Sequence, residues 1–253
     1  MKKIFSIVVI VLVLSIFCVG AVACKEQESE DEGINYVDYT IENSYEVEKV
    51  DDKELLSYLP KDVTPKYGLI FYVGTAIAPE KYDYLGNALA KQGYVVAIPK
   101  GSSGFAYLMY TETEVAFSRY PNIEFFVGGH SQGGGAAVKR ASENLDKVKG
   151  VILYAPLCYG TDTIKESGKP TLLLEATKDN VLTQDMKSDA KSRLPDTRTE
   201  YVLEGCHMSF SAMDKDATLS MFNDGPISEE QKKAQKELTA SHTLAFMKSI
   251  VNI

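Results

Sequence analysis

Short apolar runs alternate with polar and amphipathic segments along most of the chain. Strands are expected at residues 68–73, 94–98, 123–127, 148–154, 170–175 and 199–203, and the continuous apolar run at residues 68–73 is typical of a strand covered on both faces. Segments expected to form helices occupy residues 79–92, 108–119, 184–193 and 228–250, with a further helix from residue 134. Weak alternation over residues 45–58 predicts an antiparallel edge hairpin. The pattern predicts an α/β domain with a doubly wound, mostly parallel sheet and helices on both faces.

Local signals mark the ends of two of these helices. Gly93 is expected to stop the first, and Ser228-Glu229-Glu230-Gln231 at the start of the last resembles a capping box. In doubly wound sheets, ligands bind beyond the carboxyl ends of the strands. Residues that carry chemistry are therefore expected in the segments that follow the strands.

One glycine-rich segment joins a predicted strand directly to a predicted helix. It reads Gly128-Gly129-His130-Ser131-Gln132-Gly133-Gly134. A serine at such a turn has a strained backbone, and bulky residues two positions away on either side would clash, a conflict that Gly129 and Gly133 relieve. The turn exposes the Ser131 hydroxyl and aims free N–H groups of the helix, including that of Gln132, at an oxyanion. Ser131 is therefore predicted to be a nucleophile.

A nucleophilic serine needs a base, and the chain contains three histidines. His130 is next to the nucleophile, so its side chain leaves the turn in another direction, and we expect it to pack or hydrogen-bond locally. His242 lies in the last predicted helix and is interpreted as a helix-face residue. His207 lies in the loop after the strand at residues 199–203, where it can reach the strand ends. It is predicted to take the serine proton.

The acid that orients the base should lie between the nucleophile and the base in sequence. Asp179 follows the strand at residues 170–175 by a few positions, and Asp162, the alternative, follows the preceding strand. Glu175 is still inside its strand and is expected to point toward a helix layer. We favour Asp179, because the chain order Ser, Asp, His with the acid after the penultimate strand is the arrangement that accompanies this kind of serine turn. Its carboxylate would fix the imidazole tautomer and stabilise the imidazolium.

The loop after the strand at residues 68–73 should complete the oxyanion site. Gly74 and Thr75 begin it, and a backbone N–H of Thr75 or of its neighbour is the expected second donor. Large apolar residues near the expected mouth could line an acyl pocket or a partial lid, or pack in the core: Phe105, Tyr107, Leu108, Met109, Met208, Phe210, Met213, Met221 and Phe222. The sequence has no metal-ligand spacing, phosphate-binding loop or dinucleotide fingerprint, so neither a metal nor a cofactor is expected.

The first residues are predicted to be an export signal. Two lysines precede an uncharged apolar run at residues 4–23, and Ala21-Val22-Ala23 places small residues just before Cys24. Because this arrangement resembles a lipobox, we expect residues 1–23 to be a signal peptide. Cys24 would then be the lipidated residue of a lipoprotein on the outer face of the cell membrane. The alternatives are cleavage by an ordinary signal peptidase, which would secrete the protein, and an uncleaved anchor.

The mature chain is predicted to be a tether followed by one domain. Residues 24–35 are polar and acidic and predict a flexible tether, which leaves residues 36–253 as a domain that one core can support. The formal charge of the 253 residues is −8, and no basic patch alternates with aromatic residues, so nucleic acid is not expected as a partner. Cys158 and Cys206 each follow a predicted strand. In an exported chain they could form a disulfide or remain two buried thiols.

Five segments of the chain carry a family resemblance. They are Gly68-Leu69-Ile70-Phe71-Tyr72-Val73-Gly74, Ala88-Leu89-Ala90-Lys91-Gln92-Gly93-Tyr94, the serine turn at residues 128–134, Lys178-Asp179 and Gly205-Cys206-His207. Together they look like a bacterial branch of the α/β-hydrolase superfamily, near its dienelactone-hydrolase-like and esterase-like members. The resemblance runs from about Gly68 to the C-terminus. It implies the eight-stranded α/β-hydrolase fold with Ser131, Asp179 and His207 as a catalytic triad.

Two positions depart from that resemblance. The branch usually has Pro-Gly-Gly where this chain has Val73-Gly74-Thr75, and a cysteine at position 206 is not expected beside the histidine.

The sequence thus predicts an exported, membrane-tethered serine hydrolase. The expected activity is that of a carboxylesterase that forms an acyl-enzyme on Ser131 with a small-molecule ester or acyl substrate. Thioesterase, peptidase and acyltransferase activities use the same triad and are alternatives. An alternative of another class is a catalytically weak binding or scaffold lipoprotein. It would be favoured by a Gly74-Thr75 loop with no free N–H aimed at Ser131.

Overall fold

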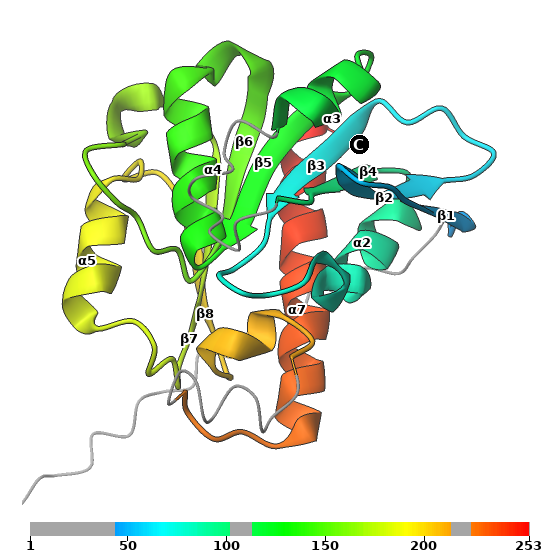
Figure 1. Ribbon diagram of the computed structural model, residues 1–253. Coiled ribbons are helices and arrows are strands. Elements are labelled where there is room, and N and C mark those ends of the chain that lie inside the picture. The colour runs from blue at the N-terminus through cyan, green and yellow to red at the C-terminus, as the bar shows by residue number, and fades with distance from the viewer. Residues whose placement is uncertain (1–43, 102–112, 214–223, 253) are drawn as a thin grey trace, which may run out of the picture. The chain divides into compact units, whose positions relative to one another are not determined.

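The computed structural model describes residues 44–101, 113–213 and 224–252 (Figure 1). The predicted signal, lipidation site and tether lie outside them. In this part of the chain one sheet is formed by β1 (Val47–Asp51), β2 (Leu55–Pro60), β3 (Tyr67–Tyr72), β4 (Val95–Pro99), β5 (Glu124–His130), β6 (Val148–Tyr154), β7 (Thr171–Ala176) and β8 (Thr199–Leu203). The strand order is β1-β2-β4-β3-β5-β6-β7-β8. The strand β2 is antiparallel to both of its neighbours, and all the other pairs are parallel.

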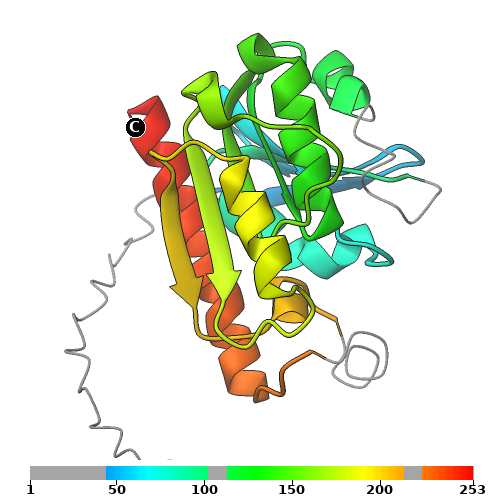
Figure 2. The same ribbon diagram turned by 90° about the vertical axis from the view of Figure 1, so that its left-hand side faces the viewer.

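Helices cover both faces of the sheet (Figures 1 and 2). On one face, α2 (Asp83–Ala90) and α7 (Glu229–Val251) close over an apolar cluster. On the other face, α3 (Thr113–Arg119), α4 (Gln132–Glu143) and α5 (Gln184–Ser192) close over a second cluster. The central strands are therefore buried on both sides, which is why their sequences are continuous apolar runs.

The predicted elements are present, with small changes at their ends. The edge hairpin is β1 and β2, and α7 begins with the expected capping box, in which the Ser228 and Gln231 side chains bond each other's backbone N–H. The helix expected at residues 79–92 consists of a 3₁₀ turn (Pro79–Tyr82) followed by α2, and Gly93 lies beyond it with a φ of 88°. The predicted helix at residues 108–119 is described only from residue 113.

The helix α4 packs unusually close to the strand ends. A Cβ on Gly133 would lie 2.2 Å from the carbonyl oxygen of Tyr72 at the end of β3, and a Cβ on Gly135 would lie 2.2 Å from that of Leu157. Only glycine permits such an approach. The start of α4 is thereby held against the carboxyl ends of β3 and β6, where ligands bind in this class of fold.

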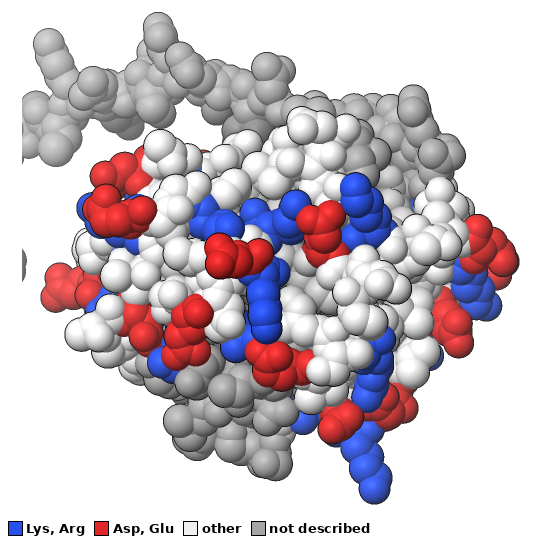
Figure 3. Space-filling view, turned by 90° about the horizontal axis from the view of Figure 1, so that it is seen from above, with Lys and Arg blue, Asp and Glu red and all other residues white. Residues whose placement is uncertain are grey.

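The face in Figure 3 shows no dominant charged area among the described residues, and the described helices include no membrane span. On the face in Figure 3, acidic and basic side chains are intermixed, and neither sign forms a large separate area among the described residues. Among the helices of the described ranges, none combines the length and the apolar character needed to cross a bilayer.

Candidate active site

The serine turn has the strained geometry that the sequence predicts. Ser131 lies between the end of β5 and the start of α4 with φ 54° and ψ −121°, a conformation that non-glycine residues rarely adopt. Its N–H donates to the carbonyl oxygen of Tyr154 at 2.9 Å, and its carbonyl oxygen accepts from the N–H of Leu157 at 2.8 Å. A Cβ on Gly129 would lie 2.2 Å from the carbonyl oxygen of Gly133, so the turn requires glycine there. Together these contacts hold the backbone of Ser131 in its strained conformation.

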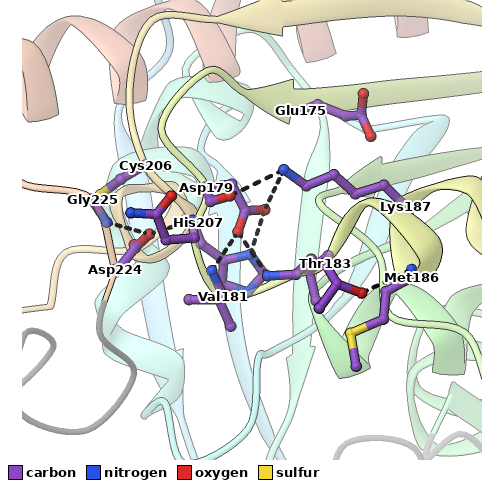
Figure 4. A network of polar contacts seen from close by, with 12 residues as sticks. Glu175, Asp179, Val181, Thr183, Met186, Lys187, Cys206, His207, Asp224 and Gly225 are labelled. Carbon is purple, nitrogen blue, oxygen red and sulfur yellow. Dashed lines mark hydrogen bonds and ion pairs between the residues drawn. The ribbon is translucent and has the colours of Figure 1, made fainter. Parts of the chain in front are cut away.

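Beyond the strand ends, a buried histidine meets a buried aspartate (Figure 4). His207, in a 3₁₀ turn (His207–Phe210) after β8, has its Nδ1 2.9 Å from Oδ2 of Asp179, which lies in the loop after β7. The two side chains are 1% and 0% exposed. An ionised carboxylate only accepts hydrogen bonds, so the ring proton lies on Nδ1 and leaves a lone pair on Nε2. In this tautomer Nε2 is the ring nitrogen that could accept a proton.

The carboxylate of Asp179 is held in its charged form. Its Oδ1 accepts from the N–H groups of Val181 at 2.9 Å and Leu182 at 3.0 Å, and Nζ of Lys187 lies 4.0 Å from Oδ2. Burial alone would raise the pKa of Asp179, but the hydrogen bond and charge of His207, the Leu182 N–H and the Lys187 ammonium together hold it below its usual value. The acid therefore remains an acceptor for the imidazole across the neutral pH range.

The other acids considered from the sequence have different partners. A carboxylate oxygen of Asp162 lies 3.6 Å from Nζ of Lys139 on α4, and Oε2 of Glu175 lies 2.7 Å from Nζ of Lys191 on α5. Glu175 therefore faces a helix layer, as expected. Asp179 is the acid that contacts His207.

A cavity of about 190 Å³ joins the serine turn to the histidine. Ser131 and His207 both line it, together with Thr75 and Gln132. The rest of its wall is apolar and comes from Ile77, Leu157, Val181, Leu182, Met186 and Met208. A serine and a histidine paired with a carboxylate thus line one small, mostly apolar space, an arrangement that acyl transfer could use.

The large apolar residues expected at the mouth of the site do not all lie in one place. Met208 lines the cavity, whereas Phe210 is fully buried and stacks on Tyr154 in the core, with ring centroids 5.5 Å apart. Met213 packs against the same core cluster. The remaining six lie outside the described residues: Phe105, Tyr107, Leu108, Met109, Met221 and Phe222.

The loop after β3 departs from the expectation in one respect. The N–H of Gly74 donates to the hydroxyl of Tyr82 at 3.1 Å, and that hydroxyl lies 2.8 Å from Nδ1 of His130. Gly74 was expected as an oxyanion donor, but in this conformation its N–H is engaged elsewhere. Of the two residues proposed for that loop, Thr75 is the one that lines the cavity with Ser131.

The two other histidines have structural surroundings. His130 is fully buried, and its ring centroid lies 4.7 Å from that of His207. Burial and the neighbouring His207 lower the pKa of His130 well below its usual value, so its ring is neutral. His242, on α7, stacks on Tyr201 of β8 with ring centroids 4.1 Å apart. His130 therefore packs and hydrogen-bonds locally, and His242 occupies a helix face, as predicted.

The cysteines are free and buried. Cys158 and Cys206 do not form the disulfide that remained open from the sequence. Burial raises the pKa of the Cys158 thiol to about 12 and that of Cys206 to about 11, so both are protonated at neutral pH. Sγ of Cys206 lies 3.0 Å from Oγ of Ser209. Within the described ranges, no group of three or more His, Cys, Asp or Glu side chains is arranged to hold a metal ion.

Two residues that the sequence did not single out hold the histidine loop. The buried carboxylate of Asp224 accepts from the N–H of Met208 at 2.7 Å, next to the histidine, and from that of Asn180 at 3.3 Å, next to the acid. The buried carboxamide of Gln235 on α7 accepts from the N–H of Cys206 at 3.1 Å and donates to its carbonyl oxygen at 3.0 Å. Both side chains bond to backbone groups, so no sequence motif could have identified them.

Comparison with known proteins agrees with this geometry. A family model described as the alpha/beta hydrolase family matches residues 68–236, more than half of the chain. The chain belongs to this family. The alpha/beta hydrolase family model includes the serine turn, Asp179 and His207, and membership supports hydrolase activity.

Among solved structures, this alpha/beta hydrolase is similar to the crystal structure of a predicted CIB-like hydrolase from Thermoplasma acidophilum. The TM-score is 0.51 and the identity 18%, over 71% of this chain and 96% of the other. At that identity the likeness concerns the fold. A search of curated proteins found no match to the chain.

Proposed function

We propose that the protein is a serine carboxylesterase with Ser131, Asp179 and His207 as its triad. The observation that carries this proposal is the shared cavity: a serine with φ 54° and a histidine paired with a buried acid both open onto it. In the proposed reaction the Ser131 oxygen attacks the ester carbonyl carbon while Nε2 of His207 takes its proton. The carbon–oxygen bond to the alcohol then breaks, and His207 returns the proton to the leaving oxygen. Water, activated by the same imidazole, releases the acid.

The cavity also bears on the substrate. Among its described lining residues the one group that can carry a charge is His207, and the remaining wall is mainly aliphatic or thioether in character. A charged acyl group would lose its hydration there without a partner. We therefore propose an uncharged acyl group that is small enough for about 190 Å³. We also propose an affinity to the dienelactone-hydrolase-like branch. The thioesterase and peptidase alternatives differ from the esterase in the leaving group, a thiol or an amine, and an acyltransferase differs in that another acceptor replaces water.

A fluorophosphonate probe tests the proposal directly. We expect the full-length protein, purified in detergent, to be labelled on Ser131 and to hydrolyse p-nitrophenyl acetate or butyrate. Ser131→Ala and His207→Ala should abolish both signals, while Ser192→Ala, an exposed serine on α5, should leave them unchanged. Labelling at another residue, or none in a folded sample, would reject the triad.

One observation favours a second candidate, a catalytically weak binding or scaffold lipoprotein. The Gly74 N–H is bonded to Tyr82 instead of facing the serine, so the loop after β3 offers one backbone donor fewer than expected. Under this alternative the protein would bind small acyl compounds in the cavity without turnover. Binding of ethyl butyrate or butyramide in isothermal titration, without hydrolysis and on a sample that the probe does not label, would support it.

The cellular location remains a proposal as well. We propose that residues 1–23 are removed and that Cys24 carries the lipid, because the lipobox-like sequence directly precedes this cysteine.

A further inference from the structure

The two edges of the sheet are built differently. At one edge, three of the five residues of β1 are charged, which is a common protection of a free edge. At the other edge, β8 (gold in Figure 2) carries Tyr201 at 42% exposure and Val202 at 53%. Within the described ranges, one other large apolar side chain, that of Met186, is exposed to this degree. Because β8 contains neither proline nor lysine, its edge is open to pairing with another strand.

The backbone of β8 directs hydrogen-bonding groups outward at this edge. The carbonyl oxygen of Leu203 accepts from the N–H of Thr177 at 3.0 Å and so points toward β7. Since the backbone groups of successive residues point to opposite sides of a strand, those of Glu200 and Val202 point away from β7. The register of β7 and β8 is continuous, and β7 is the one strand that pairs with β8 in the described sheet. Glu200 and Val202 therefore each direct an N–H and a C=O toward a possible partner strand.

The side chains of β8 are held in place by helices on both faces. The Tyr201 ring stacks on His242 of α7, with ring centroids 4.1 Å apart. On the other face, Oε1 of Glu200 lies 2.5 Å from Nζ of Lys191 on α5, and its Oε2 lies 2.9 Å from Nη2 of Arg198. The edge is already ordered, so little conformational freedom is lost when a partner strand pairs with it.

The charge pattern of β8 fits a second copy of the same strand in one register. In an antiparallel pair about a twofold axis, hydrogen-bonded residues must both point outward, so near the middle of the strand the axis can pass Glu200, Tyr201 or Val202. An axis at Glu200 places the two Glu200 carboxylates opposite each other, and an axis at Val202 places Glu200 opposite Glu204. An axis at Tyr201 instead places Glu200 opposite Val202, and it places Arg198 opposite Glu204. Facing like charges are unfavourable and facing opposite charges are favourable, so the pattern selects the axis at Tyr201.

We propose that two copies of the chain pair antiparallel through β8, with Tyr201 of one copy opposite Tyr201 of the other. The two eight-stranded sheets then form one continuous sheet. A second copy is the partner that the strand itself indicates, because its charges complement each other across the axis and the axis makes each contact occur twice. The inference does not depend on the proposed esterase activity.

Two opposite charges at position 202 test this register by sedimentation velocity. We expect the full-length protein in detergent to sediment as a dimer. Val202→Glu places a carboxylate opposite Glu200 twice in the dimer, so the dissociation constant should rise by about tenfold or more. Val202→Lys places an ammonium opposite the same carboxylate and should leave the dimer intact. Met186→Lys is the matched control: it charges a similarly exposed apolar residue outside β8 and should leave sedimentation unchanged.

Disulfide trapping tests the same axis by distance. In the proposed pairing the two Tyr201 residues form a non-hydrogen-bonded pair with Cα atoms about 4.5 Å apart, within the range that a disulfide spans. Tyr201→Cys should therefore give a covalent dimer under mild oxidation. Thr199→Cys, at an exposed position on the same face of β8, should not, because its counterpart lies about 14 Å away along the paired strands.

Three results would overturn the inference. The first is a wild type that sediments as a monomer throughout the micromolar range and a Tyr201→Cys variant that stays uncrosslinked. The second is a dimer that Val202→Lys dissociates as strongly as Val202→Glu does, since the pairing at Tyr201 requires the sign of the charge to matter. The third is a dimer that neither variant affects, because its contact would then lie on another surface.

Discussion

The carboxylate of Asp224 provides the sharpest test of how the site is held together. Its two oxygens accept from three backbone N–H groups: those of Met208 at 2.7 Å, Gly225 at 2.9 Å and Asn180 at 3.3 Å. Met208 follows His207 in the sequence, and Asn180 follows Asp179. A single buried side chain therefore joins the histidine loop to the acid loop.

The change Asp224→Asn keeps the shape and removes one acceptor oxygen. Whichever way the amide turns, at least one backbone N–H then faces an NH₂ group in a buried place. A hydrogen bond to a charged acceptor contributes about 1.5–3 kcal/mol, so we expect the free energy of unfolding to fall by about 2–4 kcal/mol. Misplacement of the imidazole should also lower kcat by about 10- to 100-fold, because small errors in catalytic geometry are costly.

The measurements are urea unfolding and p-nitrophenyl butyrate hydrolysis on the same preparations. Asp52→Asn is the matched control: Oδ1 of Asp52 accepts from the N–H groups of Glu54 at 2.8 Å and Leu55 at 2.9 Å, at the hairpin between β1 and β2. We expect Asp52→Asn to leave kcat unchanged. If Asp224→Asn loses stability but keeps the wild-type kcat, the carboxylate supports the fold and does not position the triad. If the free energy of unfolding of Asp224→Asn equals that of the wild type, the stabilisation assigned to these hydrogen bonds is wrong.

Three further changes test other parts of the structure. Asp179→Asn should lower kcat by about 10³- to 10⁴-fold. Because folding lowers the pKa of Asp179, the ionised carboxylate stabilises the fold fully above the ordinary Asp pKa of about 3.9, and this stabilisation is lost as the pH falls through the folded pKa. The urea midpoints of the wild type and the variant should therefore converge in acid. Gly133→Ala places a methyl group against two backbone oxygens that cannot rotate away, so the free energy of unfolding should drop by about 3 kcal/mol in urea titrations, and an unchanged value would contradict the close approach of α4. Cys24→Ala should move the protein out of the detergent phase in Triton X-114 partitioning; continued partitioning into detergent would favour an uncleaved anchor.

Much of the fold, and the residues of the candidate site, could be predicted because they leave local signals. Continuous apolar runs indicate doubly covered strands, and the alternation with helices indicates a parallel sheet. Ser131 is visible because its strained turn demands glycine two residues away on each side. Asp179 could be chosen over Asp162 because it follows the penultimate strand, and the structure pairs it with His207.

The positioning residues could not be predicted, because their partners are backbone groups distant in sequence. Gln235 acts on the N–H and carbonyl oxygen of Cys206, 29 residues away, and nothing in its helical sequence distinguishes it from a surface glutamine. The hydrogen bond from the Gly74 N–H to Tyr82 could not be predicted for the same reason. Tyr82 looks like a core residue of a helix face, and only the fold brings its hydroxyl to the loop after β3.

These contacts make the last helix part of the site and not only a cover for the sheet. The residue before His207 is held through both of its backbone groups by Gln235 on α7, and the residue after it is held by Asp224, shortly before that helix. A Cβ on Gly205 would lie 1.8 Å from Oε1 of Gln235, so the loop and the helix fit each other at that point. The position of the His207 ring therefore depends on how firmly α7 packs on the sheet. Under the proposed function, His207 has to keep its ring nitrogen aligned through proton transfer, so mutations in the α7 core are expected to change kcat without altering the cavity.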